Sequence, residues 1–600
     1  MPGDLVSAIF GFIGDGDMSL LQEMGERLKH RGAAVRLWSP ARDVLLGQRA
    51  HSTAGAPGEP QQSPSAVSAS IYNRQDVAAM LQQRGRHPQS EEAQELLQMA
   101  YEEFGANCFA MLNADFAVAL WDEGAQRLIL ARDCMGARLL YYWRGPRFVA
   151  FATEYKALLA ISDVQAAPDL VALQHLQRTK YLPPGHTLLQ DIQPVPAAHW
   201  LEISREEIVE HRYWKPSLNL QSISMQAAEQ QLQKIFLQAV SKRLVGAGRF
   251  GAELSGGIDS AAVVAAIHRA RPNDQVRTFS IGSGPDDPEI LGARIVAKHL
   301  ETEHREIFAG PECLPEALPK VVWYLEDPIA RTETLLYYQM MREASSHIDV
   351  VLGGYASDGL FAGLPRHKIV KMMQIAPVFR KPLEEFYHYS QASEPPQTLL
   401  GSLAKRLYYG SDEVLAPTVL GAPPAEPPSP LPRRIRGMLN EIMLGGMQHG
   451  APGWMPKVEK PHAAVGVEFR SPFLDLDLLR FSFELPERYK LRGFQDKFIL
   501  RRALLPLLPG EVVSRPKFPQ RMDYDLKLSE VLDAMADDII SPRDVRQRGF
   551  FDPGEIDVLR RRRPGRPYGD NRAMRLWTLI ATELWARQFL DHRAGAGAAP

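Results

Sequence analysis

The sequence predicts a two-domain protein in which an α+β layered domain, residues 1–212, precedes an α/β domain with a parallel sheet, residues 213–600. Short β-rich runs separated by turns dominate the first part, and strand-like and helix-like stretches alternate in the second. The chain has 600 residues, which is more than one ordinary hydrophobic core supports. At least two large domains are therefore expected.

In the first domain, runs rich in β-branched and aromatic residues are separated by helical patterns. We predict strands at residues 7–14, 67–73, 109–121, 127–133 and 139–143, and helices near residues 18–30 and 91–104. The second domain is predicted to begin with a helix over residues 225–245 and to close with an amphipathic helix over residues 576–590, whose two tryptophans are expected in the core.

The stretch Phe250–Ser260 carries the strongest functional pattern. A short apolar run enters a Ser-Gly-Gly turn and leaves into an alanine-rich helical segment, so backbone N–H groups and a helix N-terminus converge where an anion binds. The string Leu-Ser-Gly-Gly-Ile-Asp-Ser resembles the pyrophosphate loop of the N-type ATP pyrophosphatases. We therefore expect an ATP site that also binds Mg²⁺ through Asp259. Its residues would be Leu254, Ser255, Gly256, Gly257, Asp259 and Ser260.

Two further strand ends should lie at the same edge of the sheet, because ligands of parallel sheets bind at the carboxyl ends of the strands. The run 278–282 places the backbone of Ser280, Ile281 and Gly282 at the adenine pocket, with a plain core strand as the alternative. The run 350–361 breaks at a Gly-Gly pair and then presents polar residues from one turn. Its candidate site residues are Gly354, Tyr355 and Asp358.

The composition narrows the classes of function. A formal net charge of −2, with 45% apolar and 23% charged residues, predicts no general attraction to nucleic acid or anionic membranes. Because the sequence has no apolar span of about 18 residues and no signal-peptide pattern, we expect a cytoplasmic protein. The three cysteines are too scattered for a disulfide frame or a zinc site.

Several strings of the first domain resemble the glutamine-hydrolysing domain of the asparagine synthetase family. They are His30-Arg-Gly32, Ile71-Tyr-Asn73, Leu130-Ala-Arg-Asp133 with Met135-Gly136, and Phe151-Ala-Thr-Glu-Tyr-Lys-Ala-Leu158. The resemblance implies an Ntn-hydrolase-like αββα sandwich. That family cuts glutamine with a cysteine that becomes the first residue, so that its free amine acts as base.

This chain departs from that pattern at the glutamine site. Ser7 stands in the cysteine's place behind six further residues, and Ser68-Ala69-Ser70 replaces the Asn-Gly-Glu that holds glutamine. A later family aspartate is replaced by Ala93. We therefore expect a degenerate glutaminase domain that packs against the second domain. Processing that exposes Ser7 as an N-terminal nucleophile is the alternative.

The second domain resembles the adenylating, adenine-nucleotide α-hydrolase-like domain of the same family. The strings that carry this resemblance are Val467–Asp475, Leu485–Lys490, Asp496–Arg501 and Ser514-Arg-Pro-Lys-Phe518. It implies that Asp358 faces Asp259 across Mg²⁺. It also implies that Lys517 stabilises the oxyanion of the tetrahedral intermediate and the leaving adenylate.

Tyr355 bears on the substrate. Asparagine synthetases have glutamate at this position, whereas β-lactam synthetase has a tyrosine that works with a downstream glutamate to deprotonate the substrate's own amine. The similarity of Gly437-Met-Leu-Asn-Glu-Ile442 to that region nominates Glu441 as the partner. A phenol, with a reference pKa of about 10, is a poor base alone. The alternative for Glu441 is an exposed helix residue.

Together the resemblances imply an AMP-forming carbon–nitrogen ligase in which a carboxylate attacks ATP and an amine of the same molecule captures the acyl adenylate. One bound molecule makes that step effectively unimolecular. We favour a lasso-peptide cyclase, which closes a peptide macrolactam, because the C-terminal half resembles the longer cyclases. β-Lactam or carbapenam synthetases, asparagine synthesis and an inactive scaffold are the alternatives.

A lasso-peptide cyclase would act with a leader-peptide protease or recognition protein. The proline-rich segment 415–432 is expected to be a surface loop, because it holds neither a helix nor a central strand. Such a loop could act as a lid.

Overall fold

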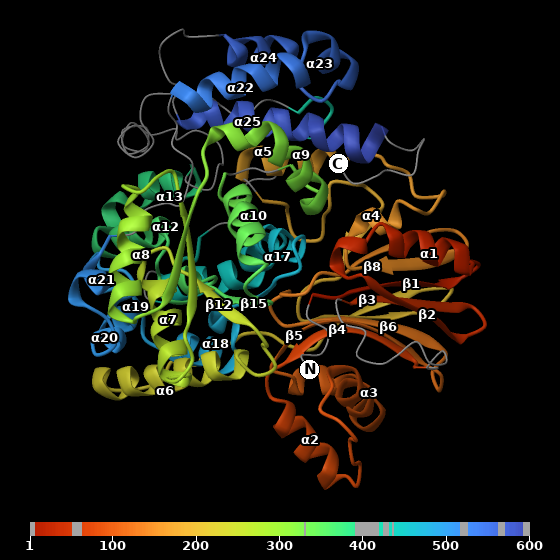
Figure 1. Cartoon of the computed structure of the whole chain (residues 1–600), viewed down its shortest axis with the longest axis horizontal. Helices are drawn as coiled ribbons and strands as arrows, with labels where there is room; N and C mark the ends of the chain where they lie inside the picture. The colour runs from red at the N-terminus through yellow and green to blue at the C-terminus, as the bar shows by residue number, and fades with distance from the viewer. Residues whose placement is uncertain are drawn as a thin grey trace.

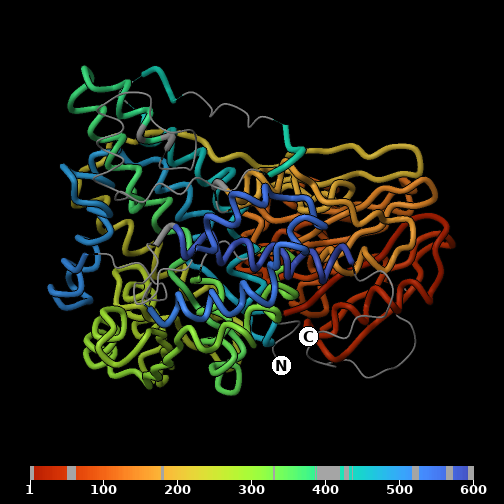
Figure 2. Tube along the Cα trace, turned by 90° about the horizontal axis from the view of Figure 1, so that it is seen from above, coloured from red at the N-terminus to blue at the C-terminus, as the bar shows by residue number. Residues whose placement is uncertain are grey.

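The computed structural model describes residues 6–50, 63–179, 181–328, 332–389, 419–423, 431–434, 437–516, 526–561 and 570–591. The N-terminal domain, red to orange in Figure 1, lies beside the C-terminal α/β domain. A group of C-terminal helices, blue in both views, lies over the two domains (Figures 1 and 2).

Two antiparallel sheets form the centre of the N-terminal domain. They have the strand orders β2-β3-β1-β8-β7-β9 and β11-β10-β6-β5-β4. Their inner faces pack together through a cluster that includes Ile9, Leu46, Ala119 and Leu130. The strands are β1 (Ala8–Gly14), β2 (Ala34–Ala41), β3 (Val44–Ala50), β4 (Ser65–Ile71), β5 (Ala114–Asp122), β6 (Arg127–Arg132), β7 (Tyr141–Arg144), β8 (Phe148–Ala152), β9 (Ile192–Pro194), β10 (His199–Ile203) and β11 (Ile208–Arg212).

Helices cover the outer faces of both sheets and complete the predicted αββα sandwich. The first sheet carries α1 (Met18–Glu26), with α4 (Tyr155–Leu158) and α5 (Leu170–Thr179) nearby (Figure 1). The second sheet packs on α2 (Arg74–Gln83) and α3 (Ala93–Phe104).

The predicted strand 109–121 is wrong in its first part. Residues Gly105–Met111 form a 3₁₀ helix, and β5 begins only at Ala114. The physical reason is that Gly105, with φ of +57°, ends α3 and turns the chain inward. Phe109 is then buried against Phe116 and Tyr213 as a short plug, with ring centroids 5.9 Å from each.

The C-terminal domain has a five-stranded sheet in the order β14-β13-β12-β15-β16, and all neighbouring pairs are parallel, as predicted. Parallel pairing brings the carboxyl ends of the strands to one edge. The strands are β12 (Phe250–Glu253), β13 (Arg277–Gly282), β14 (Glu303–Phe308), β15 (Val350–Leu352) and β16 (Glu468–Arg470).

Helices flank this sheet on both sides, with α7 and α8 on one side and α10 and α17 on the other (Figure 1). The predicted helix 225–245 is α6, and the predicted domain boundary falls where β11 ends. The helices from α6 to α21 are α6 (Met225–Arg243), α7 (Ile258–Ala270), α8 (Pro288–His299), α9 (Leu314–Leu325), α10 (Glu333–Ala344), α11 (Ser357–Leu360), α12 (Pro365–Ile375), α13 (Arg380–Tyr389), α15 (Met438–Gly445), α16 (Ala451–Trp454), α17 (Pro456–Ala463), α18 (Leu476–Glu484), α19 (Glu487–Lys490), α20 (Phe498–Leu504) and α21 (Gly510–Ser514).

Helix α25 (Asp570–Ala586) joins the two domains. It runs with α22 (Leu526–Ile539), α23 (Pro542–Arg548) and α24 (Pro553–Arg560) across the top of the molecule (Figure 1). Its two tryptophans, Trp577 and Trp585, are buried, as predicted. The indole N–H of Trp585 faces the Tyr155 hydroxyl of the N-terminal domain at 3.3 Å and donates to the Glu326 carbonyl of the C-terminal domain at 3.0 Å.

Candidate functional site

The turn between β12 and α7 has the form expected of an anion-binding loop. Gly256 has φ of +69°, and a Cβ there would lie 2.4 Å from the backbone of Gly292 in α8. Only glycine tolerates both the left-handed backbone conformation and this close approach to Gly292. The backbone N–H of Ser255 donates to the Ser260 hydroxyl at 3.1 Å, and the two hydroxyls are 3.1 Å apart. These hydrogen bonds hold the loop against the N-terminus of α7, which is a position that stabilises an anion.

Two of the predicted metal ligands converge on one lysine. Asp259, in the first turn of α7, and Asp358, in α11, contact the Lys497 ammonium at 2.5 and 2.6 Å. The other carboxylate oxygen of Asp259 accepts a hydrogen bond from Ser357 at 2.7 Å. Burial disfavours the charged ammonium, but the two carboxylates outweigh burial and raise the pKa of Lys497 above its ordinary value. The ammonium group of Lys497 therefore occupies a cation position between the two carboxylates.

Lys497 is the residue of this cluster that the sequence reasoning missed. It directly precedes α20 with φ of +53°, and its N–H donates to the carbonyl of Phe361 at 3.0 Å. A left-handed conformation costs about 1–2 kcal/mol for a side-chain-bearing residue, and strain of this kind concentrates at functional sites. The available signal was a lysine inside the family-like block Asp496–Arg501.

The strand end at β13 lies beside the loop, because the Leu254 N–H donates to the carbonyl of Phe279 at 2.8 Å. Ile281 is buried, and the hydroxyl of Ser280 lies 3.2 Å from the ring of His304. Gly282 packs closely on the first turn of α8, where a Cβ would lie 2.8 Å from Asp287. Adenine contact through the backbone of these residues stays a prediction.

The turn after β15 brings Gly354 and Tyr355 to the same edge. A Cβ on Gly354 would lie 2.8 Å from the Cβ of Asp259, so glycine permits the close approach of this turn to α7. The Tyr355 hydroxyl donates to the carbonyl of Ala451 at 2.6 Å. Burial raises the pKa of Tyr355 above its ordinary value, so the phenol holds its proton at neutral pH.

Glu441 is not in contact with Tyr355 in this structure. It lies in α15 with an exposed side chain. The neighbouring Asn440 is buried instead, and its side-chain oxygen accepts a hydrogen bond from Lys490 at 2.9 Å. Burial lowers the pKa of Lys490 to about 7. The pairing of Tyr355 with Glu441 as a base stays a prediction.

Lys517 and most of the proline-rich segment lie outside the described residues. The neighbouring Arg515 is described, and its guanidinium contacts Gly292 and donates to the carbonyl of Pro288. It therefore lies at the start of α8, next to the loop that holds Gly256. The role of Lys517 stays a prediction.

The residues that stand at the glutamine-site positions of the N-terminal domain form hydrogen bonds with one another and with the C-terminal domain. The Ser7 hydroxyl donates to Ser68 at 2.8 Å, and the Ser70 hydroxyl donates to Glu468 of β16 at 2.7 Å. Arg138 forms an ion pair with Glu468 at 3.0 Å, and Arg470 donates to it at 2.7 Å. Although burial opposes ionisation, the two guanidinium groups lower the pKa of Glu468 to about 2.

Within the described ranges, no group of three or more His, Cys, Asp or Glu side chains is arranged to hold a metal ion. None of the helices in the described part of the chain has the length and apolar character needed to cross a membrane.

Comparison with protein families assigns both domains. The family described as "Asparagine synthase" matches residues 231–587, and that described as "Glutamine amidotransferase domain" matches residues 6–214. The asparagine synthase match alone spans more than half of the chain. The protein belongs to the asparagine synthase family.

Full-length relatives in this family match both domains. A Mycobacterium tuberculosis protein, provisionally named a glutamine-hydrolysing asparagine synthetase, is 28% identical over 90% of this chain and 86% of its own. Asparagine synthetase 3 of Bacillus subtilis is 25% identical over 82% of this chain and 80% of its own. The carboxyethyl-arginine β-lactam synthase of Streptomyces clavuligerus is 28% identical over 78% of this chain and 74% of its own. The chain is thus an ATP-dependent carbon–nitrogen ligase of this family, which contains both asparagine synthetases and a ring-forming enzyme.

Proposed function

We propose that this protein activates a substrate carboxylate as an acyl adenylate and closes an amide with an amine of the same molecule, and that the substrate is a peptide closed to the macrolactam of a lasso peptide. One observation carries the intramolecular reaction. The residues expected to bind ATP converge at one sheet edge, whereas the glutamine-site positions are filled by Ser7, Ser68, Ser70 and Glu468. With no glutaminase to supply ammonia, the acceptor amine comes from the substrate.

The site fits ATP with Mg²⁺. The Lys497 ammonium already stands in for a cation between Asp259 and Asp358, and a hard divalent cation prefers carboxylate oxygens of this kind. Two carboxylates are fewer ligands than Mg²⁺ requires, and phosphate and water oxygens would supply the remaining ones. Bound there, Mg²⁺ would neutralise charge on the phosphates.

The chain's own residues account for binding and for charge. The N–H group of Gly256 and those at the N-terminus of α7 would bind the phosphates, and Lys497, displaced from the two carboxylates by the metal, would add a compact positive charge. The substrate carboxylate oxygen attacks the α-phosphorus, and the bond to the β-phosphate oxygen breaks to release pyrophosphate. The amine then attacks the acyl carbon, AMP leaves with the electron pair of the acyl carbon–oxygen bond, and the amine loses a proton.

That proton needs an acceptor. Tyr355 is protonated at neutral pH and donates its hydroxyl hydrogen to the carbonyl of Ala451. It can therefore act as a base only if a carboxylate takes up its proton. Glu441, exposed in α15, is the proposed carboxylate, and it would have to come within hydrogen-bond distance of Tyr355 when the substrate is bound. Lys517 is proposed to stabilise the oxyanion.

The second candidate is closure of a small ring, as in the β-lactam synthase relative. Tyr355 and the 28% identity to that enzyme favour it. The length of the C-terminal half, through α25, favours the peptide. We further propose that the protein acts in the cytoplasm with a leader-peptide protease or recognition protein.

Mass spectrometry of a candidate precursor core peptide, incubated with ATP, Mg²⁺, the maturation protease and this protein, tests the proposal. Loss of one water with the threaded topology retained is the expected result. Cyclisation of small β-amino acids alone would instead establish the β-lactam reaction, and asparagine formed from aspartate would establish the family's ordinary one.

The Tyr355→Phe variant should slow ring closure while leaving adenylate formation largely intact, with Tyr338→Phe on α10 as the matched control. Equal loss of adenylation and closure in Tyr355→Phe would contradict the role given to the phenol.

A further inference from the structure

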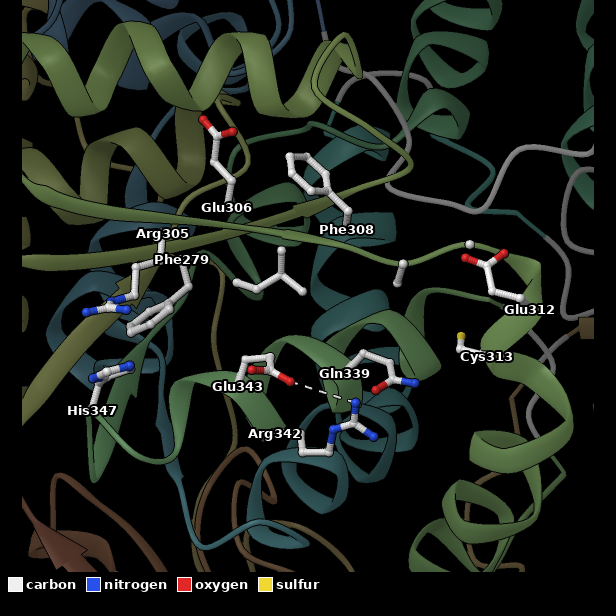
Figure 3. A pocket seen from close by; sticks show the side chains of 13 residues that line it. Phe279, Arg305, Glu306, Phe308, Glu312, Cys313, Gln339, Arg342, Glu343 and His347 are labelled. Carbon is white, nitrogen blue, oxygen red and sulfur yellow. Dashed lines mark ion pairs between the residues drawn. The ribbon is translucent and has the colours of Figure 1, made fainter.

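A cavity of about 410 Å³ lies between the edge strand β14 and helix α10 and is not lined by Asp259 or Asp358. Figure 3 shows Phe308 on the strand side and Gln339 and Arg342 on the helix side. This volume is in the range of small-molecule sites and is large enough for an amino acid. The reaction proposed above does not use this cavity.

Gln339 gives the first sign of a ligand. Its side chain is 94% buried, since only 6% of the residue is exposed, and its Oε1 atom has no hydrogen-bond partner within the described part of the chain. Gln339 lines the cavity. A buried carbonyl oxygen without a donor is unfavourable, and natural structures rarely leave one unless a ligand or water satisfies it.

Arg342 gives the second sign. It lies one helical turn after Gln339, so the two side chains share a face of α10. Its ion-pair contact with Glu343 is 3.8 Å long, which is beyond hydrogen-bond distance. A guanidinium with its paired N–H groups free is suited to bind a carboxylate with two hydrogen bonds.

Most other charged groups of the wall are paired. Glu306 and Glu312 line the cavity, and each is engaged by a cation: Arg294 at 2.6 Å for the first and Lys527 at 2.6 Å for the second. Arg305, the second arginine of the wall, is paired with Glu303 at 3.0 Å. Arg342 thus remains as the cation for a carboxylate, with the Glu343 carboxylate beside it, so a ligand with one carboxylate and one N–H donor matches Arg342 and Gln339.

Apolar groups complete the lining. Phe308, with half of its surface exposed, and Ile307 extend from β14, and Phe279 stacks on His347 with centroids 6.5 Å apart. An apolar side chain that covers the exposed ring of Phe308 gains by burying apolar surface.

We propose that this cavity binds an α-amino acid with an apolar side chain, through its amino or amide N–H to Gln339 and its carboxylate to Arg342. Two sources share this chemistry: a free amino acid and the C-terminal residue of a peptide.

Cys313 is a built-in reporter, because it lines the cavity and is half-buried. Bound ligand should shield it from iodoacetamide, and alkylation is followed by mass spectrometry in mildly alkaline buffer, since burial raises the pKa of this thiol. Cys108 and Cys134 are buried, with pKa values raised to about 12, and serve as slow internal references.

The probes are L-leucine, N-acetyl-L-leucine and L-leucinamide, used with the full-length protein. Saturable protection by leucine alone identifies a free amino acid, and protection by N-acetyl-leucine as well identifies a peptide C-terminus. Leucinamide lacks the carboxylate and should not protect. Protection by none of the probes, or equal protection by leucinamide, overturns the proposal.

Two variants test the contacts. Gln339→Leu and Arg342→Gln should each raise the leucine concentration for half-protection by roughly tenfold, as expected for loss of a hydrogen bond to a charged group. Lys320→Gln on α9, whose ammonium pairs with Glu316 and does not line the cavity, is the matched control and should leave the half-protection concentration unchanged. If the thermal melt shows that Gln339→Leu does not fold, the Arg342→Gln variant alone tests the proposed site. Unchanged half-protection in Arg342→Gln would rule the site out.

Discussion

Two clusters of buried polar residues, one in each domain, differ in how their charges are balanced. Around Ser7, one carboxylate, Glu468, lies between two guanidinium groups that belong to Arg138 and Arg470. Around Asp259, two carboxylates share the single ammonium of Lys497. The first cluster is closed by a residue from the other domain, whereas the second keeps excess negative charge.

Backbone conformation does not separate the clusters. Gly256, Ala356 and Lys497 have positive φ near the second cluster, and Val6, directly before Ser7, has φ of +43° at the first. The balance of charge does separate them, because a binding site is not optimised for the ligand-free state and keeps uncompensated charge. The cluster around Ser7 thus forms an interface between the domains, whereas the cluster around Asp259 stays electrostatically incomplete.

The largest effect is expected from Asp259→Asn and Asp358→Asn. Each should reduce substrate-dependent exchange of pyrophosphate into ATP by about a hundredfold or more, because a carboxylate proposed to bind Mg²⁺ is lost. Exchange of labelled pyrophosphate measures this, with Asp349→Asn as a control carboxylate that pairs with Arg249 outside the site. Wild-type exchange in both variants would remove the assignment of the ATP site.

Glu468→Gln should have the next largest effect, on stability. It leaves Arg138 and Arg470 without their carboxylate in a buried interface, which typically costs about 3–5 kcal/mol. Because the folded-state pKa of Glu468, about 2, lies below its ordinary 4.5, this stabilisation is present above about pH 4.5 and is lost as the pH falls toward 2. Urea unfolding at several pH values measures both effects. A variant as stable as wild type at neutral pH would mean that the cluster is not a structural interface.

Gly256→Ala should destabilise the protein by about 1–3 kcal/mol, since it combines a left-handed conformation with a clash against Gly292. Gly284→Ala is the matched control in the nearby turn, because nothing lies within 4 Å of its Cβ position. The control should stay within about 0.5 kcal/mol in urea unfolding. Equal stability of the two variants would contradict the close packing of the loop on α8.

Ser7→Ala should have the smallest effect. It removes one buried hydrogen bond, to Ser68, so the cost is about 1 kcal/mol or less, and pyrophosphate exchange should not change. Glutamate release should stay at the buffer level for wild type and variant. Glutaminase activity that depends on Ser7 would show that the N-terminal cluster is a working site.

Local patterns predicted the features whose contacts are close in sequence. The β12–loop–α7 unit, the parallel sheet and the buried Trp577 and Trp585 all follow from periodicity, propensity and turn residues. The 3₁₀ helix Gly105–Met111 was missed because burial of Phe109 overrides its strand propensity.

Contacts between distant residues could not be read from the sequence. Lys497 lies 238 positions from Asp259, and Glu468 lies 398 positions from Ser70. No periodicity links such residues, because their meeting depends on how the strands are ordered in each sheet. The same limit applies to Gln339, whose unsatisfied oxygen becomes visible only when α10 is placed beside β14.

The long reach of the interface contacts has a consequence for synthesis of the protein. Buried Arg31 binds Glu459, which lies 428 positions further along the chain, and α25 contributes the indole of Trp585 near the end. At about 5–20 residues per second, a ribosome needs on the order of tens of seconds to supply Glu459 after Arg31. During that interval Arg31 has Glu154 of its own domain as a partner but lacks Glu459. The contacts that join the two domains therefore form only after the last helices of the nascent chain are made.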